Sequence, residues 1–291
     1  MKNYINFNGE IIEKEKFSLE LSNRAFRFGD SIFETIRVFE GKIIFIDEHF
    51  SRLKSTLKIV RMNIPEYFTG EYLESEILKL VDSHQSSLNA RIRLTVYRKA
   101  SSSIYFVDGN EGFDFVIEYS VLKDRNFGDS IPSYEIDVFD EIRKPNGVLS
   151  QIKSNNVILH SIAGSVATAK SINNIVLLNE NGYLTEAVNA NIFVVKGGTI
   201  ITPKLTDGCV DGIMRSNVIN IIKKQTNYQL EVRSIDVNEL QSSDEVFLTN
   251  SIIGVQPVYK YKNTNYSTRI IGEIKLLINS NINSLLDRLE S

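Results

Sequence analysis

The chain has 291 residues, enough for two domains, and its 42% hydrophobic and 24% charged residues are ordinary for a globular protein. Its formal net charge of −3 gives no broad electrostatic case for binding nucleic acid or an anionic membrane surface. Cys209 is the lone cysteine, the first residues lack the apolar core of a signal peptide, and no apolar run approaches the ~20 residues of a membrane span, so we expect a cytoplasmic protein.

The first part of the chain alternates strand and helix patterns. After a loop that begins near Ala25, strands over 33–38 and 43–46 flank a Glu-Gly-Lys turn and predict a hairpin. Asp47 is a suitable N-cap, so we expect a helix to begin there, with apolar residues recurring at helical spacing. A second helix is expected after Thr69. Two more strands are predicted, over 91–98 and 113–119.

A polar segment with glycine and proline, residues 123–132, predicts a linker between domains over 1–122 and 133–291. The elements expected after it are helices over 156–171, from Asp211 as a cap, and over 268–289, with strands over 175–178, 183–185, 191–196, 199–202 and 246–249. Because several hairpins interrupt the alternation of strands and helices, the pattern argues against a doubly wound parallel sheet and favours two α+β domains with a cleft between them.

Motifs of several common enzyme classes are missing from the sequence. There is no GxGxxG, no Walker A loop, no HExxH, no CxxC pair and no GxSxG elbow. The three histidines, His49, His84 and His160, are scattered along the chain, so we expect no metal site. The sequence therefore contains no motif that indicates hydride transfer, phosphoryl transfer, zinc-dependent hydrolysis or serine hydrolysis.

Lys153 stands at the end of an extended stretch and just before a predicted helix. A lysine can hold a carbonyl coenzyme covalently and move a proton if desolvation or a nearby cation keeps it partly neutral. Taken alone, Lys153 fits a solvated surface lysine better, since that is the usual state of this residue type.

The segments around Lys153 give it more weight. Two segments precede it: Phe33-Glu34-Thr35 and His49-Phe50-Ser51-Arg52. The lysine itself stands in Lys153-Ser154-Asn155-Asn156. Three segments follow: Thr185-Glu186, Asn191-Ile192-Phe193 and Asp211-Gly212-Ile213-Met214-Arg215. Together these segments resemble the class IV, fold-type IV, aminotransferases, which use pyridoxal 5'-phosphate. That family includes branched-chain and D-amino-acid aminotransferases and aminodeoxychorismate lyases.

The resemblance implies a two-domain α+β (α/β) fold with a smaller N-terminal α/β domain, a larger C-terminal domain with a mixed sheet, and the active site in the interdomain cleft. It also implies a homodimer in which a partner loop completes each cleft. Aromatic and arginine residues typical of interfaces cluster early in the chain, although these aromatics could also form the first domain's own core. They are Tyr4, Phe7, Phe26, Phe28 and Phe33, with Arg24 and Arg27.

The resemblance assigns the coenzyme contacts. Lys153 would be the catalytic lysine, and Glu186 would contact the pyridine nitrogen, where a carboxylate keeps the nitrogen protonated. The phosphate would be bound by Arg52, by the backbone of Ile213 and Met214 at a helix start, and by Ser251. Met214 replaces the family's usual threonine, so only its backbone can serve. Asn191 completes the cofactor-binding set.

Substrate residues are implied at four positions: Phe33, Arg91, Arg93 and Arg98. Branched-chain members tend to have tyrosine where Arg91 stands, and D-amino-acid members have tyrosine where Phe33 stands, so the chain departs from both patterns. Its Arg-x-Arg-Leu-Thr-Val-x-Arg run looks somewhat like that of aminodeoxychorismate lyases. Alternating arginines that simply face solvent on a half-buried strand explain the pattern equally well.

The sequence therefore predicts an aminotransferase that moves an amino group between an amino acid and a 2-oxo acid by a ping-pong mechanism and is branched-chain-like. One alternative is an aminodeoxychorismate lyase that releases pyruvate and 4-aminobenzoate at the same site. Another is a catalytically idle homologue with a binding role. Intact Lys153 and Glu186 argue against the idle homologue, whereas Met214 keeps it open.

Overall fold

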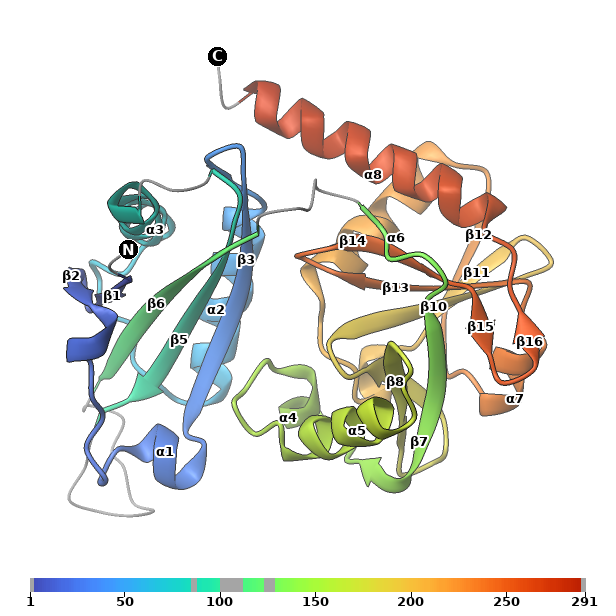
Figure 1. The fold of residues 1–291 in the computed structure, drawn as a ribbon, viewed down its shortest axis with the longest axis horizontal. Coiled ribbons are helices and arrows are strands. Elements are labelled where there is room, and N and C mark those ends of the chain that lie inside the picture. Colours follow the sequence, from blue (N-terminus) through green and yellow to red (C-terminus); the bar gives the residue numbers. More distant parts are fainter. Residues whose placement is uncertain (1–2, 85–87, 100–111, 123–128, 289–291) are drawn as a thin grey trace. The chain divides into compact units, whose positions relative to one another are not determined.

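The structure is a computed structural model that describes residues 3–84, 88–99, 112–122 and 129–288 (Figure 1). The expected linker over 123–132 falls partly outside the described residues. The chain divides into two compact units. The first comprises Met1–Asp124 with Lys153–Asn156, and the second comprises Arg125–Ile152 with Val157–Ser291. The short segment that carries Lys153 therefore belongs structurally with the N-terminal residues.

The first unit is an antiparallel sheet with two long helices on one face (Figure 1). Its strands follow the order β2-β1-β6-β5-β3-β4. The strands are β1 Tyr4–Phe7, β2 Glu10–Glu13, β3 Ser31–Phe39, β4 Lys42–Ile43, β5 Ala90–Arg98 and β6 Phe113–Val121. The helices are η1 Lys14–Lys16, α1 Arg24–Phe28, α2 Ile46–Ile59 and α3 Gly70–His84.

The core of the first unit lies between this sheet and helices α2 and α3. Alternate residues of β5, Ile92, Leu94 and Val96, are fully buried there against α2 and α3, which contribute leucines such as Leu53 and Leu73. Alternation places the remaining residues of β5 on the opposite face of the sheet. The arginines of β5 therefore point away from this core or stand at the strand's end.

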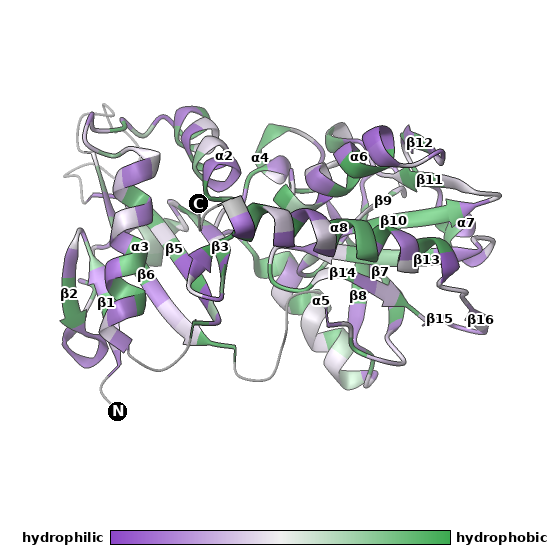
Figure 2. Ribbon diagram, turned by 90° about the horizontal axis from the view of Figure 1, so that it is seen from above, coloured by the Kyte–Doolittle hydropathy of each residue, from purple (hydrophilic) through white to green (hydrophobic). Residues whose placement is uncertain are grey.

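The second unit is built on a mixed sheet of ten strands. Its path is β12-β11-β10-β9-β8-β7-β15-β16, and β13 pairs with β10 and β14. The β7–β8, β7–β15 and β11–β12 pairs are parallel and the others are antiparallel. The middle residues of the central strands β8 and β10 are hydrophobic and buried, as Figure 2 shows for β10, which is typical of strands buried on both faces.

The strands of this unit are β7 Glu135–Lys144, β8 Asn174–Asn179, β9 Leu184–Ala187, β10 Ala190–Lys196, β11 Thr199–Thr202, β12 Gln229–Val232, β13 Glu245–Asn250, β14 Gly254–Val258, β15 Lys260–Tyr261 and β16 Thr264–Asn265. Its helices are α4 Val148–Gln151, α5 Ile158–Ala169, η2 Leu205–Asp207, α6 Ile213–Gln225, α7 Val237–Gln241 and α8 Arg269–Arg288. No helix in the described part of the chain is long and apolar enough to cross a membrane.

The predicted fold class is confirmed, since both units mix helices and strands and the larger sheet is mixed rather than doubly wound. Two predicted helix caps are wrong. The N-cap of α2 is Phe45, in the left-handed region at φ 60°, so Asp47 lies inside the first turn, where a carboxylate still favours the helix dipole. The N-cap of α6 is Gly212, and Asp211 precedes it.

Three local predictions also need correction. The loop expected near Ala25 contains α1, whose N-cap Asn23 accepts hydrogen bonds from the backbone of Ala25 and Phe26. The second hairpin strand ends at Ile43, because the chain turns there into α2. Lys153 does not end a long extended stretch, since α4 lies only two residues before it.

Candidate functional site

In the first unit, Arg52 is fixed by a buried carboxylate. Arg52 on α2 donates from Nε to Glu34 Oε1 at 2.8 Å and from Nη2 to Glu34 Oε2. Nδ1 of His49, one turn earlier on α2, lies 2.7 Å from Glu34 Oε2. Burial by itself raises the pKa of the Glu34 carboxyl, but the Arg52 charge and hydrogen bonds from both partners outweigh it and lower that pKa to about 2. Glu34 is therefore ionised at neutral pH and orients the arginine fork.

His49 is the buried end of this cluster. Its side chain is fully buried, and its Nε2 has no hydrogen-bond partner among the described residues. Burial lowers the pKa of His49 more than the adjacent Glu34 raises it. His49 is thus neutral at pH 7, and the positive charge of the cluster resides on Arg52.

Phe33 on β3 lies against two cations. The Arg93 guanidinium carbon is 3.8 Å from the centre of the Phe33 ring, and Lys153 Nζ is 4.5 Å from it. Arg93 also donates to Asn155 Oδ1 at 2.8 Å. The backbone N–H of Phe33 donates to the Lys153 carbonyl at 2.8 Å, and that of Asn155 donates to the Ser31 carbonyl at 3.1 Å. An isolated antiparallel β-bridge between Ile32 and Ser154 thus attaches the Lys153 segment to β3. The structure thus brings Phe33, Arg93 and Lys153 together.

The other two predicted substrate arginines have different surroundings. Arg98 is buried, and it donates to Asp30 Oδ2 at 3.0 Å and to the backbone carbonyls of Val60 and Arg61. These bonds tie the end of β5 to α2. Arg91 is exposed near the opposite end of β5. Neither arginine shares the contact that joins Arg93 to Phe33.

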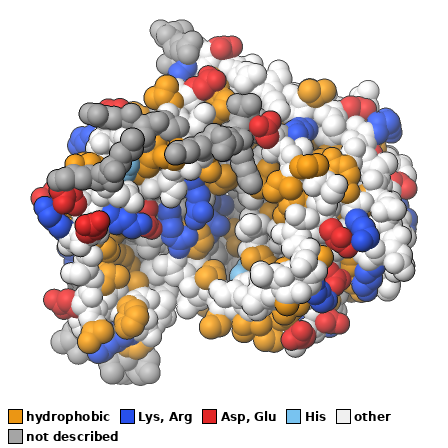
Figure 3. Space-filling model, in the orientation of Figure 1, with side chains coloured by type: hydrophobic (Ala, Val, Ile, Leu, Met, Phe, Trp, Pro, Cys, Tyr) orange, Lys and Arg blue, Asp and Glu red, His pale blue; other side chains and the backbone are white. Residues whose placement is uncertain are grey.

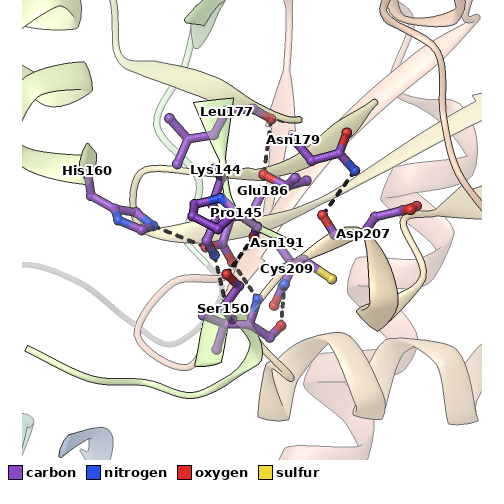
Figure 4. A network of polar contacts seen from close by, with 12 residues as sticks. Lys144, Pro145, Ser150, His160, Leu177, Asn179, Glu186, Asn191, Asp207 and Cys209 are labelled. Atoms are coloured by element: carbon purple, nitrogen blue, oxygen red, sulfur yellow. Dashed lines mark hydrogen bonds and ion pairs between the residues drawn. The ribbon is translucent and has the colours of Figure 1, made fainter. Parts of the chain in front are cut away.

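Glu186 is the centre of a buried polar network in the second unit (Figure 4). Its Oε1 accepts a hydrogen bond from Lys144 Nζ at 2.5 Å and lies 3.1 Å from His160 Nε2. Its Oε2 accepts the backbone N–H of Val210 at 2.8 Å. Burial raises the pKa of the Glu186 carboxyl, but the Lys144 charge and the hydrogen bonds of His160 and Lys144 outweigh it and lower that pKa to about 2. The carboxylate is therefore a permanent negative charge.

The geometry of three elements assembles this network. Glu186 lies within β9, Lys144 ends β7, and His160 stands on the first turn of α5. The β7–β8 register shifts between Phe139 and Lys144, and such irregularities re-aim side chains at the end of a strand. Sequence reasoning did not find Lys144 or His160, because neither lies in a motif.

The turn before α6 is held by Asn191. Its Nδ2 donates to the carbonyl of Val210 at 2.8 Å, and a Cβ on Gly212 would clash with its Oδ1. A side chain at position 212 would therefore displace the Asn191 side chain or shift the turn. Ile213 and Met214 follow as the first residues of α6, where backbone N–H groups have no partner inside the helix. The Met214 side chain is buried, so what Met214 can offer a ligand is its backbone.

The turn after β13 carries Ser251. The side chain of Asn250 shapes this turn by accepting the backbone N–H groups of Ile252 and Ile253 at 3.0 and 2.9 Å. Ser251 is half-buried, whereas the hydroxyl of Thr249 is buried with no hydrogen-bond partner among the described residues. An unsatisfied buried hydroxyl is rare in proteins. Thr249, which the sequence did not single out, is therefore a further candidate ligand on this strand.

In each unit taken by itself, the donors fit part of a phosphorylated pyridine better than a metal. The second unit offers an ionised carboxylate, a helix start with backbone donors and two hydroxyls, and the first unit offers an oriented arginine and Lys153. These are the groups that a pyridinium nitrogen, a phosphate and a carbonyl carbon require. In the described ranges, no group of three His, Cys, Asp or Glu side chains could hold a metal ion.

Comparisons with known proteins agree with this donor set. Residues 31–261 match the family model for amino-transferase class IV. The chain is 30% identical to a probable branched-chain-amino-acid aminotransferase of Aquifex aeolicus, over 92% of this chain and 87% of that protein. It is 28% identical to an aminodeoxychorismate lyase of Bacillus subtilis, over 90% and 88%.

A solved structure of similar fold is the branched-chain amino acid aminotransferase from Thermobaculum terrenum in its PLP form, at TM-score 0.83 and 20% identity, covering 97% of this chain and 94% of that one. Another relative is longer: the chain spans about half (46%) of branched-chain-amino-acid aminotransferase-like protein 2 of Arabidopsis thaliana, to which it is 27% identical. The family match extends over most of the chain, so this protein belongs to the class IV aminotransferases, a family of enzymes that depend on pyridoxal 5'-phosphate.

Proposed function

We propose that this protein is an aminotransferase that moves an amino group between an amino acid and a 2-oxo acid by a ping-pong mechanism, with a branched-chain-like substrate. The observation that carries the proposal is that Glu186 is buried and ionised. Among the described residues one donor, the Val210 N–H, bonds to its Oε2, which can accept a second hydrogen bond. A carboxylate of this kind suits a protonated ring nitrogen. The relative of Aquifex aeolicus, whose name includes this activity, supports the choice.

The proposal assigns a role to each group that would hold the coenzyme. Lys153 would bind its carbonyl carbon, and Glu186 would accept the ring N–H. Its phosphate would be bound by four groups: the Arg52 guanidinium, the backbone of Ile213 and Met214, and the Ser251 hydroxyl. Asn191 would support the turn that presents the α6 backbone. When bound, pyridoxal 5'-phosphate supplies the electron sink that stabilises a carbanion at the α-carbon of the substrate.

The chain's own residues would perform the proton transfer. Lys153 Nζ lies 4.5 Å from the centre of the Phe33 ring, which Arg93 also contacts. In its neutral form, the Lys153 amine can accept the α-proton. Arg93, which Asn155 holds in place, is the best placed of the three arginines to bind a substrate carboxylate. Arg98 would instead act indirectly, since it ties β5 to α2.

The second candidate is a lyase acting on aminodeoxychorismate. The observation that favours it is the pair Arg91 and Arg93, which extends outward along one face of β5 and would suit an acidic ring substrate. The similarity to the Bacillus subtilis lyase also supports it. A catalytically idle homologue would have no use for the ionised carboxylate that the Glu186 network maintains.

The proposal includes a homodimer. Exposed hydrophobic side chains gather on and before α1, where Leu21 is 78% and Phe26 71% exposed, and Figure 3 shows this group at the lower left. Two residues of the predicted interface instead make contacts within the first unit: Arg24 is buried against Asp30, and Phe33 contacts Lys153. Phe26 and Phe28 therefore remain the aromatic residues best suited to a partner.

One experiment separates the candidates. The protein is incubated with pyridoxal 5'-phosphate, and its absorbance is followed after addition of single L-amino acids, single D-amino acids or aminodeoxychorismate. The proposal predicts conversion to the pyridoxamine form with L-leucine, L-isoleucine or L-valine and recovery with a 2-oxo acid. Release of pyruvate from aminodeoxychorismate, without a second substrate, would establish the lyase instead. No spectral change with any of these compounds would support the idle homologue.

A further inference from the structure

Lys144 is a buried lysine to which the proposed function gives no role. Its side chain is 6% exposed, and it donates to Glu186 Oε1 at 2.5 Å and to the carbonyl of Ser150 at 3.1 Å. Buried ion pairs contribute little net stability compared with apolar side chains of the same size. The distinct effect of Lys144 is therefore the positive charge that it places beside the Glu186 carboxylate.

The hydrogen bonds of Glu186 define what remains for a ligand. A carboxylate has about four acceptor positions. Lys144 and His160 contact Oε1, and the Val210 N–H occupies one position on Oε2 (Figure 4). Among the described residues, one position on Oε2 is left. A ring N–H that binds there shares its carboxylate with the Lys144 ammonium.

We propose that Lys144 is a positioning residue that acts through Glu186: its charge limits how tightly this carboxylate keeps a proton on the ring nitrogen of the coenzyme. The inference rests on the proposed function, because it requires the coenzyme to bind at Glu186. A cation beside a carboxylate weakens the attraction of that carboxylate for a second cation, which here is the protonated ring. The strength of the electron sink is thus set by Lys144 and Glu186 together.

The other charges near the network leave this role to Lys144. Those that act on Glu186 come from Lys144 on β7 and from His160 on α5. Three more titratable groups lie in the same neighbourhood: Cys209, Asp211 and Arg215. Burial raises the pKa of the Cys209 thiol to about 12, so this thiol carries no charge at neutral pH. Among the described residues, Lys144 is the lysine that forms an ion pair with Glu186.

The test uses variants that separate charge from hydrogen bonding. Lys144→Gln removes the charge and keeps a hydrogen-bond donor, Lys144→Met removes both, and Lys144→Arg keeps the charge. Lys170→Gln is the matched control, because Lys170 pairs with Asp137 at the surface of the same unit. Each variant is loaded with pyridoxal 5'-phosphate labelled with ¹⁵N in the ring, and the ¹⁵N chemical shift is followed against pH.

The proposal predicts that Lys144→Gln and Lys144→Met lower the acid dissociation constant of the ring nitrogen at least about tenfold, which corresponds to one pKa unit. Lys144→Arg and Lys170→Gln should leave it near the wild-type value. If Lys144→Met does not fold, Lys144→Gln decides alone. A purely structural lysine would give variants that lose coenzyme more readily without any change in this constant.

Three results overturn the proposal. The first two are an acid dissociation constant of the ring nitrogen that is unchanged in Lys144→Gln, or one that is increased in that variant. The third is a wild-type ring nitrogen that stays protonated across the whole accessible pH range, because Lys144 would then not limit how tightly the ring nitrogen holds its proton. Failure of the proposed function has a different signature, since L-leucine, L-isoleucine and L-valine would then leave the bound coenzyme of the wild type unconverted to its pyridoxamine form, whatever the ¹⁵N shift shows. A protein that retains coenzyme but shows no effect of Lys144 overturns only the present inference.

Discussion

The Arg52 guanidinium and the Glu34 carboxylate form a two-point contact, in which Arg52 Nε lies 2.8 Å from Glu34 Oε1 and Nη2 bonds to Oε2. The contact connects α2 to β3 in the first unit. It fixes the direction of a positive fork before any phosphate arrives, and preorganisation of this kind lowers the cost of ligand binding. Two consequences can be measured, one for coenzyme affinity and one for stability.

Glu34→Gln should weaken the binding of pyridoxamine 5'-phosphate by about tenfold, because the amide can orient only part of the guanidinium. It should also lower the free energy of unfolding by about 2 kcal/mol, since a charge-assisted bond inside the unit is lost. Equilibrium dialysis and urea unfolding measure the two effects. Glu118→Gln is the control. Glu118 lies on β6 of the same sheet as Glu34, is partly exposed and forms an ion pair with Lys14. Equal coenzyme affinity in Glu34→Gln and wild type would contradict the orienting role.

Acid should destabilise the protein through Glu34 and Glu186. Each has a pKa lowered from 4.5 to about 2 in the folded state, so each stabilises the fold at pH values above about 4.5 and loses this contribution as pH falls toward 2. The full loss, reached at about pH 2, is on the order of 3 kcal/mol per group, and about 2 kcal/mol of it occurs above pH 3. Urea unfolding of the apoprotein between pH 6 and pH 3 measures this part. Glu34→Gln and Glu186→Gln should each flatten the dependence, and a wild-type stability independent of pH in this range would refute the pairing.

Gly212→Ala tests the turn before α6. The new Cβ would clash with Asn191 Oδ1, so either the Asn191 side chain rotates and loses its hydrogen bond to Val210 or the turn shifts. Either change should disturb the first backbone N–H groups of the helix. We expect a loss of about 1–3 kcal/mol in stability, as for other overpacked sites, and weaker binding of the coenzyme phosphate. The matched control is Gly272→Ala in α8, where nothing lies within 4 Å and the helix should gain up to about 1 kcal/mol. Gly212→Ala/Asn191→Ala should recover part of the loss.

The oligomeric state is testable at α1. A homodimer that buries Phe26 and Phe28 should be disrupted by Phe26→Asp, since a charge cannot be buried without a partner. Sedimentation of the wild-type protein at micromolar concentration should give twice the mass of the 33.1 kDa chain, and the variant should shift toward a single chain. The control is Tyr67→Asp, because Tyr67 is another exposed aromatic residue of the first unit, 59% exposed and outside α1. A wild-type protein that is active as a single chain would refute the dimer.

Most strands could be predicted from the sequence because their patterns are local. The alternation in β5 required only that Ile92, Leu94 and Val96 share a buried face. The helix starts were placed wrongly because the N-caps, Phe45 and Gly212, have no side-chain cap to recognise. In both cases an aspartate nearby gave a misleading signal.

The candidate site could be predicted only where a motif contains it. Arg52, Lys153 and Glu186 stand in segments that resemble the family, whereas Lys144 lies 42 residues from Glu186 in a stretch without any motif. Its contact with Glu186 depends on how β7 and β9 are placed in the sheet, and no local pattern encodes that. The resemblance assigned Arg98 to the substrate. In the structure Arg98 is buried and donates to three oxygen atoms of the first unit, and sequence spacing alone does not distinguish such an arginine from one that binds a ligand.

Glu186→Gln should slow removal of the α-proton by about two to three orders of magnitude while the coenzyme stays bound. The amide cannot keep the ring nitrogen protonated, which weakens the electron sink, and preorganised charges of this kind contribute about 3–4 kcal/mol to a transition state. Single-turnover absorbance with an amino acid in excess measures the half-reaction. Glu180→Gln, at a turn of the same unit, is the control for a surface carboxylate. An unchanged half-reaction would show that Glu186 is not the partner of the ring.

The most direct test of the central claim is the identity of the lysine that holds the coenzyme. The protein is loaded with pyridoxal 5'-phosphate, reduced with borohydride and digested, and the modified peptide is identified by mass spectrometry. We expect one phosphopyridoxyl group, on Lys153, and none on Lys153→Ala, which should keep the wild-type circular dichroism spectrum. A stoichiometric adduct on any other lysine, or an adduct of undiminished yield in Lys153→Ala, would contradict it.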